Sequence, residues 1–144
     1  MNKIKIKNLQ KKTKINQKKL RSFAEKVLKN KGIDKTELSV LLVDNLKIKQ
    51  LNEKYLGKNS ATDVLAFRMA DGDFNEIHPE ILGDVIISLE MAKKCAKQLN
   101  SRWEEEVYLY LTHGILHLLG YSDLTEKGFN QMQEMQKEIL EKCA

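Results

Sequence analysis

A long apolar segment that ends in two histidines constrains the fold of this chain more than any other part of its sequence. Residues 102–119 carry apolar side chains on most sides of a helix, and Ser101 and Glu104 have the spacing of a capping box at its start. A helix that is apolar on most sides is buried among its neighbours. We therefore expect a central, buried helix over these residues, around which the other elements pack.

The two histidines of that segment have the spacing of a metal site. His113 and His117 are four residues apart, so a helix places their imidazoles one above the other on the same face. Gly120 is expected to end the helix, and the chain reversal that it permits can bring Asp123 back over the histidines. Two nitrogens and one carboxylate oxygen would leave a tetrahedral divalent ion one open position. The spacing predicts a metal site at His113, His117 and Asp123.

Two other interpretations of this segment stay open. Asp123 lies three residues before Glu126, a spacing that is common at helix starts, so Asp123 can instead cap the next helix. Metalloproteases carry a glutamate general base directly after the first histidine, and Gly114, at that position, has no side chain to accept a proton. The pattern therefore favours a metal-dependent hydrolase, with peptide hydrolysis as the weaker alternative.

The composition is that of a globular, intracellular protein. The 144 residues are 42% hydrophobic and 31% charged, and they include no run of about 20 apolar residues that could cross a membrane. Cys95 and Cys143 form neither a C-x-x-C pair nor a disulfide pattern, which is typical of a reducing compartment. We expect a single domain, residues 1–144, in the cytoplasm and without membrane contact.

Positive charge is concentrated near the start of the chain. Residues 1–35 contain 13 of the 25 Lys and Arg residues and only two acids, whereas the remaining residues are net acidic. Such a block attracts a polyanion through counterion release, which makes Lys11, Lys12 and Lys14 candidates for contacts with the phosphates of a nucleic acid. The alternative is a solvated lysine-rich surface that binds nothing.

Strands and helices alternate along the chain without repeats or a linker. Period-two or continuous apolar patterns predict strands around Ile4 and Ile6 and over residues 36–43, 62–68 and 81–88. Besides the central helix, we expect helices from Asn16 to Gly32, from Asp44 or Asn45 to Gly57, and over residues 89–99 and 126–142. Residues 71–76 contain a D-x-D pattern, which we interpret as a turn rather than a second metal site. These elements predict an α+β domain.

Three segments resemble the YbeY family of bacterial endoribonucleases that mature ribosomal RNA. Residues 113–121 are similar to the family's metal helix, residues 62–67 to its T-D-V-L-S-F strand, and residues 82–88 to its L-G-D-I-x-I-S strand. The resemblance covers nearly the whole chain and implies a mixed four-stranded sheet packed with about five helices. It also implies a catalytic zinc ion, a role in 16S rRNA 3′-end maturation and ribosome quality control, and RNA and the small ribosomal subunit as partners.

Two positions depart from the family pattern. The family has histidine as its third ligand where this chain has Asp123, and a carboxylate is a harder, charged donor, so other divalent ions compete better with zinc. Leu56 stands where the family usually has an arginine that contacts phosphate. Lys58 and Arg68 are the nearest substitutes in sequence and thus candidates for a catalytic charge, although both are also typical surface residues.

The sequence and the resemblance together predict a metallo-endoribonuclease that is specific for single strands and hydrolyses RNA phosphodiester bonds with one metal ion per chain. No residue is identified as the general base. Two alternatives remain, a metalloprotease-like hydrolase and a non-catalytic, ribosome-associated RNA-binding protein whose metal is structural. All three could bind an ion, so activity with added metal distinguishes them.

Overall fold

Four strands and five helices make up the described parts of the chain, which are residues 1–69 and 80–144 of a computed structural model. The strands are β1 (Lys3–Asn8), β2 (Glu37–Val43), β3 (Val64–Arg68) and β4 (Ile81–Ser88). The helices are α1 (Gln17–Asn30), α2 (Asn45–Leu56), α3 (Leu89–Leu99), α4 (Trp103–Leu118) and α5 (Glu126–Cys143). The predicted α+β fold is confirmed, and the D-x-D pattern of residues 71–76 lies outside the described residues.

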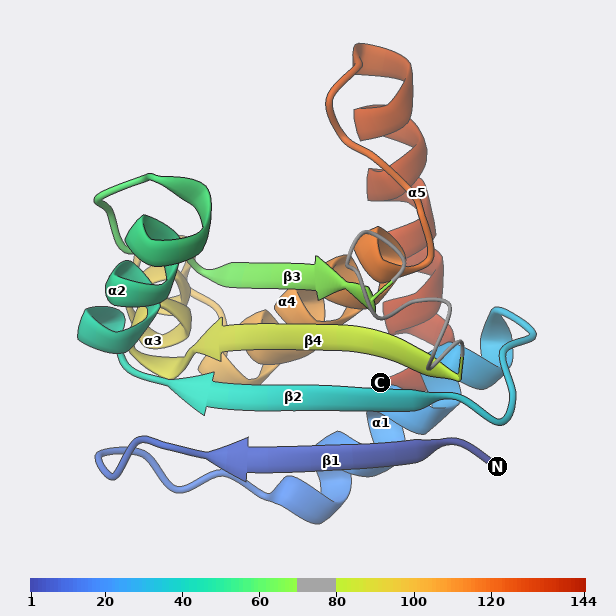
Figure 1. Cartoon of the computed structure of the whole chain (residues 1–144), viewed down its shortest axis with the longest axis horizontal. Helices are drawn as coiled ribbons and strands as arrows, with labels where there is room; N and C mark the ends of the chain where they lie inside the picture. Colours follow the sequence, from blue (N-terminus) through green and yellow to red (C-terminus); the bar gives the residue numbers. More distant parts are fainter. Residues whose placement is uncertain (70–79) are drawn as a thin grey trace.

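The sheet is mixed, with the strand order β1-β2-β4-β3 (Figure 1). β1, β2 and β4 are parallel, and β3 pairs antiparallel with β4. The continuous apolar run at the end of β2 places this strand inside the sheet, as predicted, because both of its faces are covered there. β1 forms one edge, where its exposed lysines discourage pairing with another chain.

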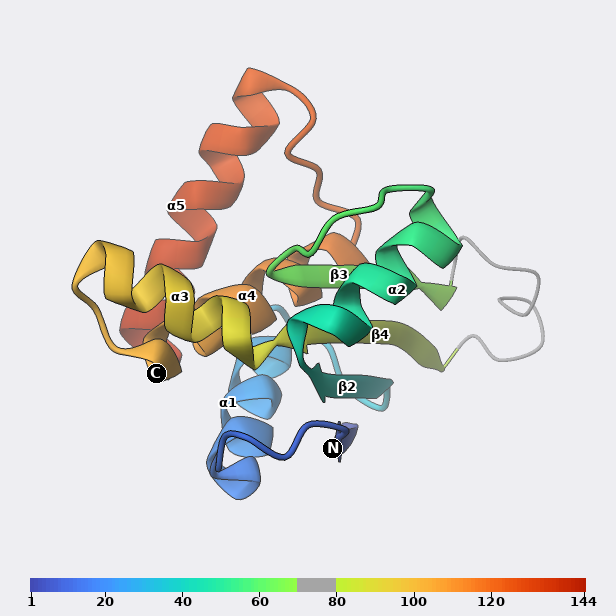
Figure 2. The same cartoon turned by 90° about the vertical axis from the view of Figure 1, so that its left-hand side faces the viewer.

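Helices cover the two faces of the sheet unequally (Figure 2). The larger core lies on the face that carries Ile4, Val40 and Val85, where the sheet packs against α1 and α4. On the opposite face, α2 contributes Ile48 to a smaller apolar cluster with Leu65 and Ile86. The alternation of side chains along β4 therefore assigns Val85 to one core and Ile86 to the other.

Local capping signals explain most of the helix boundaries. The Asn16 side chain accepts a hydrogen bond of 3.0 Å from the backbone N–H of Lys19, and Asp44 accepts one of 2.8 Å from Lys47. Gly57 ends α2 with φ of +69°, in the left-handed region that glycine adopts without strain. These predicted helix ends are confirmed.

α4 is the central helix, as predicted, and contacts α1, α3, α5, β3 and β4. Its buried side chains include Leu111, Ile115 and Leu116, none of which is exposed to solvent. Although α4 is this apolar, no helix within residues 1–69 and 80–144 combines the length and the hydrophobicity needed to cross a bilayer. α4 is thus a rigid support enclosed by the rest of the domain.

The capping box predicted at the start of α4 is wrong. Arg102 is the N-cap residue, and its side chain forms no capping hydrogen bond. The Ser101 hydroxyl instead donates a hydrogen bond of 3.2 Å to the carboxylate of buried Glu106. Because the helix begins one residue later than the capping box requires, Ser101 lies outside the cap position, and its hydroxyl is oriented by Glu106 instead.

Two glycines allow α4 to lie directly on β4. A Cβ atom added at Gly114 would be 2.7 Å from a methyl carbon of Val85, and one added at Gly83 would be 2.9 Å from Leu118. These contacts show that α4 runs antiparallel to β4, because the later residue on the helix meets the earlier residue on the strand. The two histidines consequently lie over the end of the sheet where β4 begins.

Candidate metal centre

The last two turns of α4 and the segment after it bring the three predicted ligands together. His113 and His117 lie on the same face of α4, and Gly120, with φ of +100°, reverses the chain directly after the helix. Asp123 follows within the segment 119–125, which joins α4 to α5. The donor atoms of all three side chains lie within 4.8 Å of one another. The predicted cluster is therefore present as a candidate metal site.

The facing atoms of the cluster are all electron-rich. The Nε2 atoms of His113 and His117 are 3.0 Å apart, and they lie 3.6 Å and 3.8 Å from the two carboxylate oxygens of Asp123. Neutral imidazole nitrogens and a carboxylate repel one another at these distances unless a proton or a cation lies among them. The arrangement therefore favours a positive charge at its centre.

These distances fit a small divalent cation. Ligand bonds of about 2.0–2.2 Å in a tetrahedral site place donor atoms roughly 3.3–3.6 Å apart, and the measured separations lie on both sides of that range. Each of the three side chains is between 25% and 32% exposed, so the centre is open to solvent on one side. A site with three protein ligands and an open side is the kind that supports catalysis rather than structure alone.

Asp123 does not cap the next helix. The N-cap residue of α5 is Thr125, whose hydroxyl oxygen accepts a hydrogen bond of 3.0 Å from the backbone N–H of Gly128. The helix-cap interpretation of Asp123 is therefore wrong. Its carboxylate is left to face the two histidines.

Gln136 of α5 orients His113 through the ring nitrogen that faces away from the cluster. The Nδ1 atom of His113 lies 2.5 Å from the side-chain carbonyl oxygen of Gln136, which is only 4% exposed. A carbonyl can only accept, so His113 carries its proton on Nδ1 and presents the lone pair of Nε2 to the cluster. Partners of this kind fix the tautomer and direction of metal-binding histidines.

The environment keeps His117 uncharged. Burial lowers the pKa of His117, and the neighbouring His113 lowers it further, whereas the carboxylate of Asp123 opposes both effects. A neutral imidazole is the form that binds a metal ion. The partial burial of the cluster therefore favours the ligand state of His117 at neutral pH.

The structure brings Arg68, but not Lys58, to the end of α4 that carries the cluster. Arg68 pairs with Gly83 at the start of β4, and Leu118, adjacent in sequence to His117, packs at the same point. Lys58 lies in the exposed loop before β3, at the other end of that strand. The candidate catalytic charges thus lie apart from each other.

The lysines predicted to contact RNA lie far from the cluster. Lys11, Lys12 and Lys14 are exposed in the connection between β1 and α1. This connection begins where the backbone of Leu9 bonds to Leu42 near the end of β2, so it lies at the opposite end of the sheet from the start of β4. The Nζ atom of Lys12 also lies 3.9 Å from a carboxylate oxygen of Glu90, at the start of α3.

Sequence reasoning missed Gln136. A signal for it exists, because Gln136 follows buried Met132 by four residues and precedes buried Ile139 by three, which puts a polar side chain on the apolar face of α5. A buried polar group needs a partner, so such a position indicates a specific contact. The sequence does not identify His113 as that partner.

Comparison with known proteins agrees with the fold and the cluster. The family profile described as "Endoribonuclease YbeY" matches residues 5–144. The chain is 38% identical to Endoribonuclease YbeY of Syntrophotalea carbinolica, covering 96% of this chain and 94% of that protein. It is 37% identical to the protein of the same name from Geobacter sulfurreducens, covering 95% and 93%.

A solved structure shares the architecture. The solution structure of TM1509 from Thermotoga maritima superposes with a TM-score of 0.66 at 29% sequence identity, covering 96% of this chain and 87% of that one. The likeness in sequence and in fold therefore extends over nearly the full length, including the helix that carries both histidines. On these grounds the chain belongs to the endoribonuclease YbeY family.

Proposed function

We propose that this protein is a metal-dependent endoribonuclease that hydrolyses phosphodiester bonds in single-stranded RNA, with residues 1–144 as one catalytic domain. The observation that carries the proposal is the convergence of His113, His117 and Asp123 to within 4.8 Å in a chain of the endoribonuclease YbeY family. The cluster is accessible from one side, as a polymeric substrate requires.

His113, His117 and Asp123 would hold one divalent ion per chain. We propose zinc, with other divalent ions able to replace it because the carboxylate of Asp123 is a hard donor. The ion would supply a Lewis acid for a phosphoryl oxygen of the substrate. Gln136 keeps the Nε2 atom of His113 free of a proton, and Asp123 adds the negative charge that retains a cation.

Arg68 is the basic candidate that supports phosphate chemistry best. It lies on β3 beside the end of α4 that carries the histidines, whereas Lys58 precedes the far end of that strand. A guanidinium can hold a phosphate with two hydrogen bonds, which positions the scissile group and offsets developing negative charge. Arg68 would thus bind phosphate in place of the arginine that the family usually has where this chain has Leu56.

Peptide hydrolysis is the less favourable alternative for a steric reason as well as a chemical one. A metalloprotease needs a glutamate at the position of Gly114, and any Cβ atom there would be 2.7 Å from Val85. The close packing of α4 on β4 thus excludes the general base on which that chemistry depends.

We further propose that the biological substrate is 16S rRNA and that the protein acts in 3′-end maturation and ribosome quality control. This rests on its family membership and on the concentration of lysine in residues 1–35, which suits a ribosomal RNA partner. Lys11, Lys12 and Lys14 would contact the RNA backbone at a distance from the metal centre.

A metal-supplemented cleavage assay tests the proposal. The metal-free protein is incubated with single-stranded RNA, double-stranded RNA or a peptide library, before and after addition of zinc or manganese. We expect cleavage of single-stranded RNA only, at least 100-fold slower in His113→Ala, because a two-ligand remnant holds the ion poorly. Cleavage of peptides, or RNA cleavage that is unaffected in His113→Ala, would contradict the proposal.

A further inference from the structure

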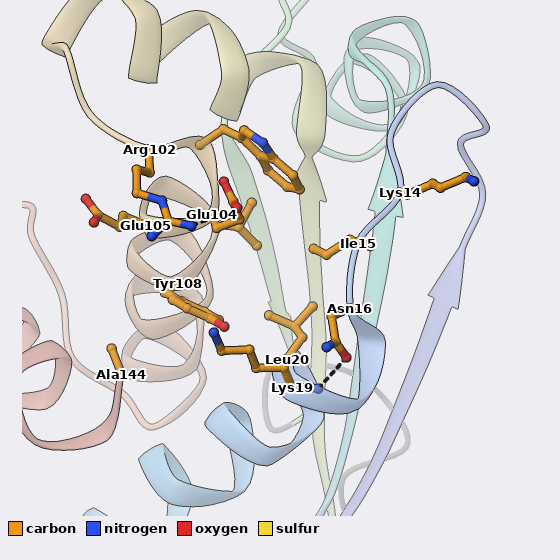
Figure 3. Close-up of a pocket in the computed structure, with 12 residues that line it drawn as sticks. Lys14, Ile15, Asn16, Lys19, Leu20, Arg102, Glu104, Glu105, Tyr108 and Ala144 are labelled. Carbon is orange, nitrogen blue, oxygen red and sulfur yellow. Dashed lines mark hydrogen bonds and ion pairs between the residues drawn. The ribbon is translucent and has the colours of Figure 1, made fainter.

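A pocket of about 390 Å³ lies at the start of α4, whereas the metal centre lies near its end. Figure 3 shows the residues that line this pocket. Its walls come from the start of α1, with the connection that precedes it, and from the first turns of α4. Trp103 lines this pocket ten residues before His113, which corresponds to about 15 Å along the helix axis. The pocket is therefore separate from the metal centre but close enough for one strand of nucleic acid to reach both.

The interior of the pocket suits a flat, aromatic ligand. Ile15, Leu20, Trp103 and Tyr108 contribute apolar and aromatic surface. Tyr108 is held in place from its other side by Phe23, at 4.5 Å between ring centroids. Nucleobases stack on such side chains whatever their sequence, because every base has a π-face. The volume of the pocket is at the lower end of the range of small-molecule sites and suits one nucleotide.

The charge at the mouth of the pocket suits an anion. Lys14 and Lys19 line it and form no ion pair with any residue in 1–69 or 80–144. Lys93 does not line the pocket, but its Nζ atom lies 5.5 Å from the ring centroid of Trp103, which does. Of the two acids at the pocket, Glu104 is paired with Arg102 at 3.4 Å, and Figure 3 shows Glu105 directed away from Leu20. Figure 3 also shows the Lys14 side chain directed away from Leu20, whereas the Lys19 side chain extends towards Tyr108. The positive charge beside the aromatic surface is therefore that of Lys19.

We propose that this pocket binds one base of single-stranded RNA, with the adjoining phosphate held by Lys19, and so anchors the substrate at a distance from the metal centre. The proposal deepens the proposed endoribonuclease function and rests on it for the identity of the ligand. It turns the predicted basic block into a specific site, because Lys19 belongs both to the block and to the wall of the pocket.

Trp103 makes the pocket directly observable, since it is the only tryptophan in the chain. The probe is a single-stranded oligonucleotide with 2′-O-methyl groups, which block hydrolysis, added to the metal-free protein. We expect saturable quenching of the tryptophan emission. In Lys19→Gln, Kd should rise about tenfold or more, and the slope of log K against log salt should fall by about one.

The matched control is Lys49→Gln, which removes the same charge from an exposed position on α2. Its Kd should change less than about threefold if the pocket, rather than net charge, binds the RNA. Equal losses in the two variants would overturn the proposal. RNA binding that is detected by the anisotropy of a labelled strand but leaves the tryptophan emission unchanged would also overturn the proposal. In that case a partner protein would be the remaining ligand for the pocket.

Cleavage of unmodified RNA by the wild-type protein with added metal is measured in parallel. This measurement tests the endoribonuclease proposal independently of the pocket proposal. Metal-dependent cleavage without quenching of the tryptophan emission would overturn the proposal for the pocket and support the proposed endoribonuclease activity. Quenching that the pocket variant weakens, in a protein that cleaves nothing, would support the pocket and refute the endoribonuclease.

Discussion

The Nδ1 atom of His113 lies 2.5 Å from the Oε1 atom of Gln136, so a buried amide on α5 sets the orientation of a metal-ligand candidate on α4. This contact links the helix that carries the cluster to the last helix of the chain. Residues of this kind affect metal affinity without contacting the ion.

Gln136→Met should weaken metal binding about 10- to 100-fold, because the thioether is of similar size but accepts hydrogen bonds poorly. Gln136→Glu should preserve affinity, since a carboxylate still accepts from Nδ1. Gln133→Met, on the exposed side of α5, is the control. Competition titrations with a chromophoric chelator measure the dissociation constants, and an unchanged value in Gln136→Met would refute the positioning role.

Removing one histidine should empty the centre. The wild-type protein is expected to contain about one divalent ion per chain, and His117→Ala close to none, because two remaining ligands lose the chelate geometry. Elemental analysis of the purified proteins gives the stoichiometry. Metal content that is the same in His117→Ala and the wild type would show that the ion lies elsewhere.

Asp123 variants separate charge from geometry at the third ligand. Asp123→Ser and Asp123→Asn should lose most metal affinity and nearly all cleavage, while Asp123→His should retain zinc. Thermal stability in the metal-free state should change little in all three, because Thr125 provides the cap of α5. Full affinity in Asp123→Ser would exclude Asp123 as a ligand.

The contact between Gly114 and Val85 predicts a packing defect with a matched rescue. Gly114→Ala should lower the free energy of unfolding by about 1–3 kcal/mol, since the new methyl group would overlap the valine. In Gly114→Ala/Val85→Ala the combined loss should be smaller than the sum of the two single losses. Denaturant unfolding measures all four proteins, and additive losses would show that the helix moves away instead.

The carboxyl group of Asp84, on the face of the sheet opposite to α4, predicts a pH dependence of the protein's stability. Asp84 is exposed at the surface of β4, but desolvation by the surrounding chain still raises its pKa above the ordinary 3.8, and a hydrogen bond with Ser39 opposes the shift. The folded state therefore binds a proton more readily than the unfolded state, so Asp84 costs stability once the pH exceeds its folded pKa. Asp84→Asn should raise Tm at pH 7, and this gain should shrink as the pH falls towards 3.8. A gain independent of pH would contradict this.

Signals that act over a few residues were enough to predict the secondary structure. Asn16 and Gly57 act on backbone groups within their own turn, so their effect is visible in the sequence. The same holds for the α4 histidines, whose spacing fixes their common face. The capping box at Ser101 failed because the N-cap position falls on Arg102, and the Ser101 hydroxyl donates its hydrogen bond to Glu106.

Features built from several segments could not be predicted. Gln136 is one of three glutamines in α5, and only the packing of α5 on α4 selects it as the partner of His113. The pocket at Trp103 combines the starts of two helices that are more than 80 residues apart in sequence.

The segment 119–125 separates the third candidate ligand from the helix that carries the other two. His113 and His117 are fixed by α4, whose packing on β4 tolerates little change, whereas Asp123 stands on a connection that begins at the turn of Gly120. Exchanging a carboxylate for an imidazole there requires no repacking of the core. If the cluster holds an ion as proposed, substitutions in this connection alone would change the ion preference, while the sequence constraints on the core stay the same.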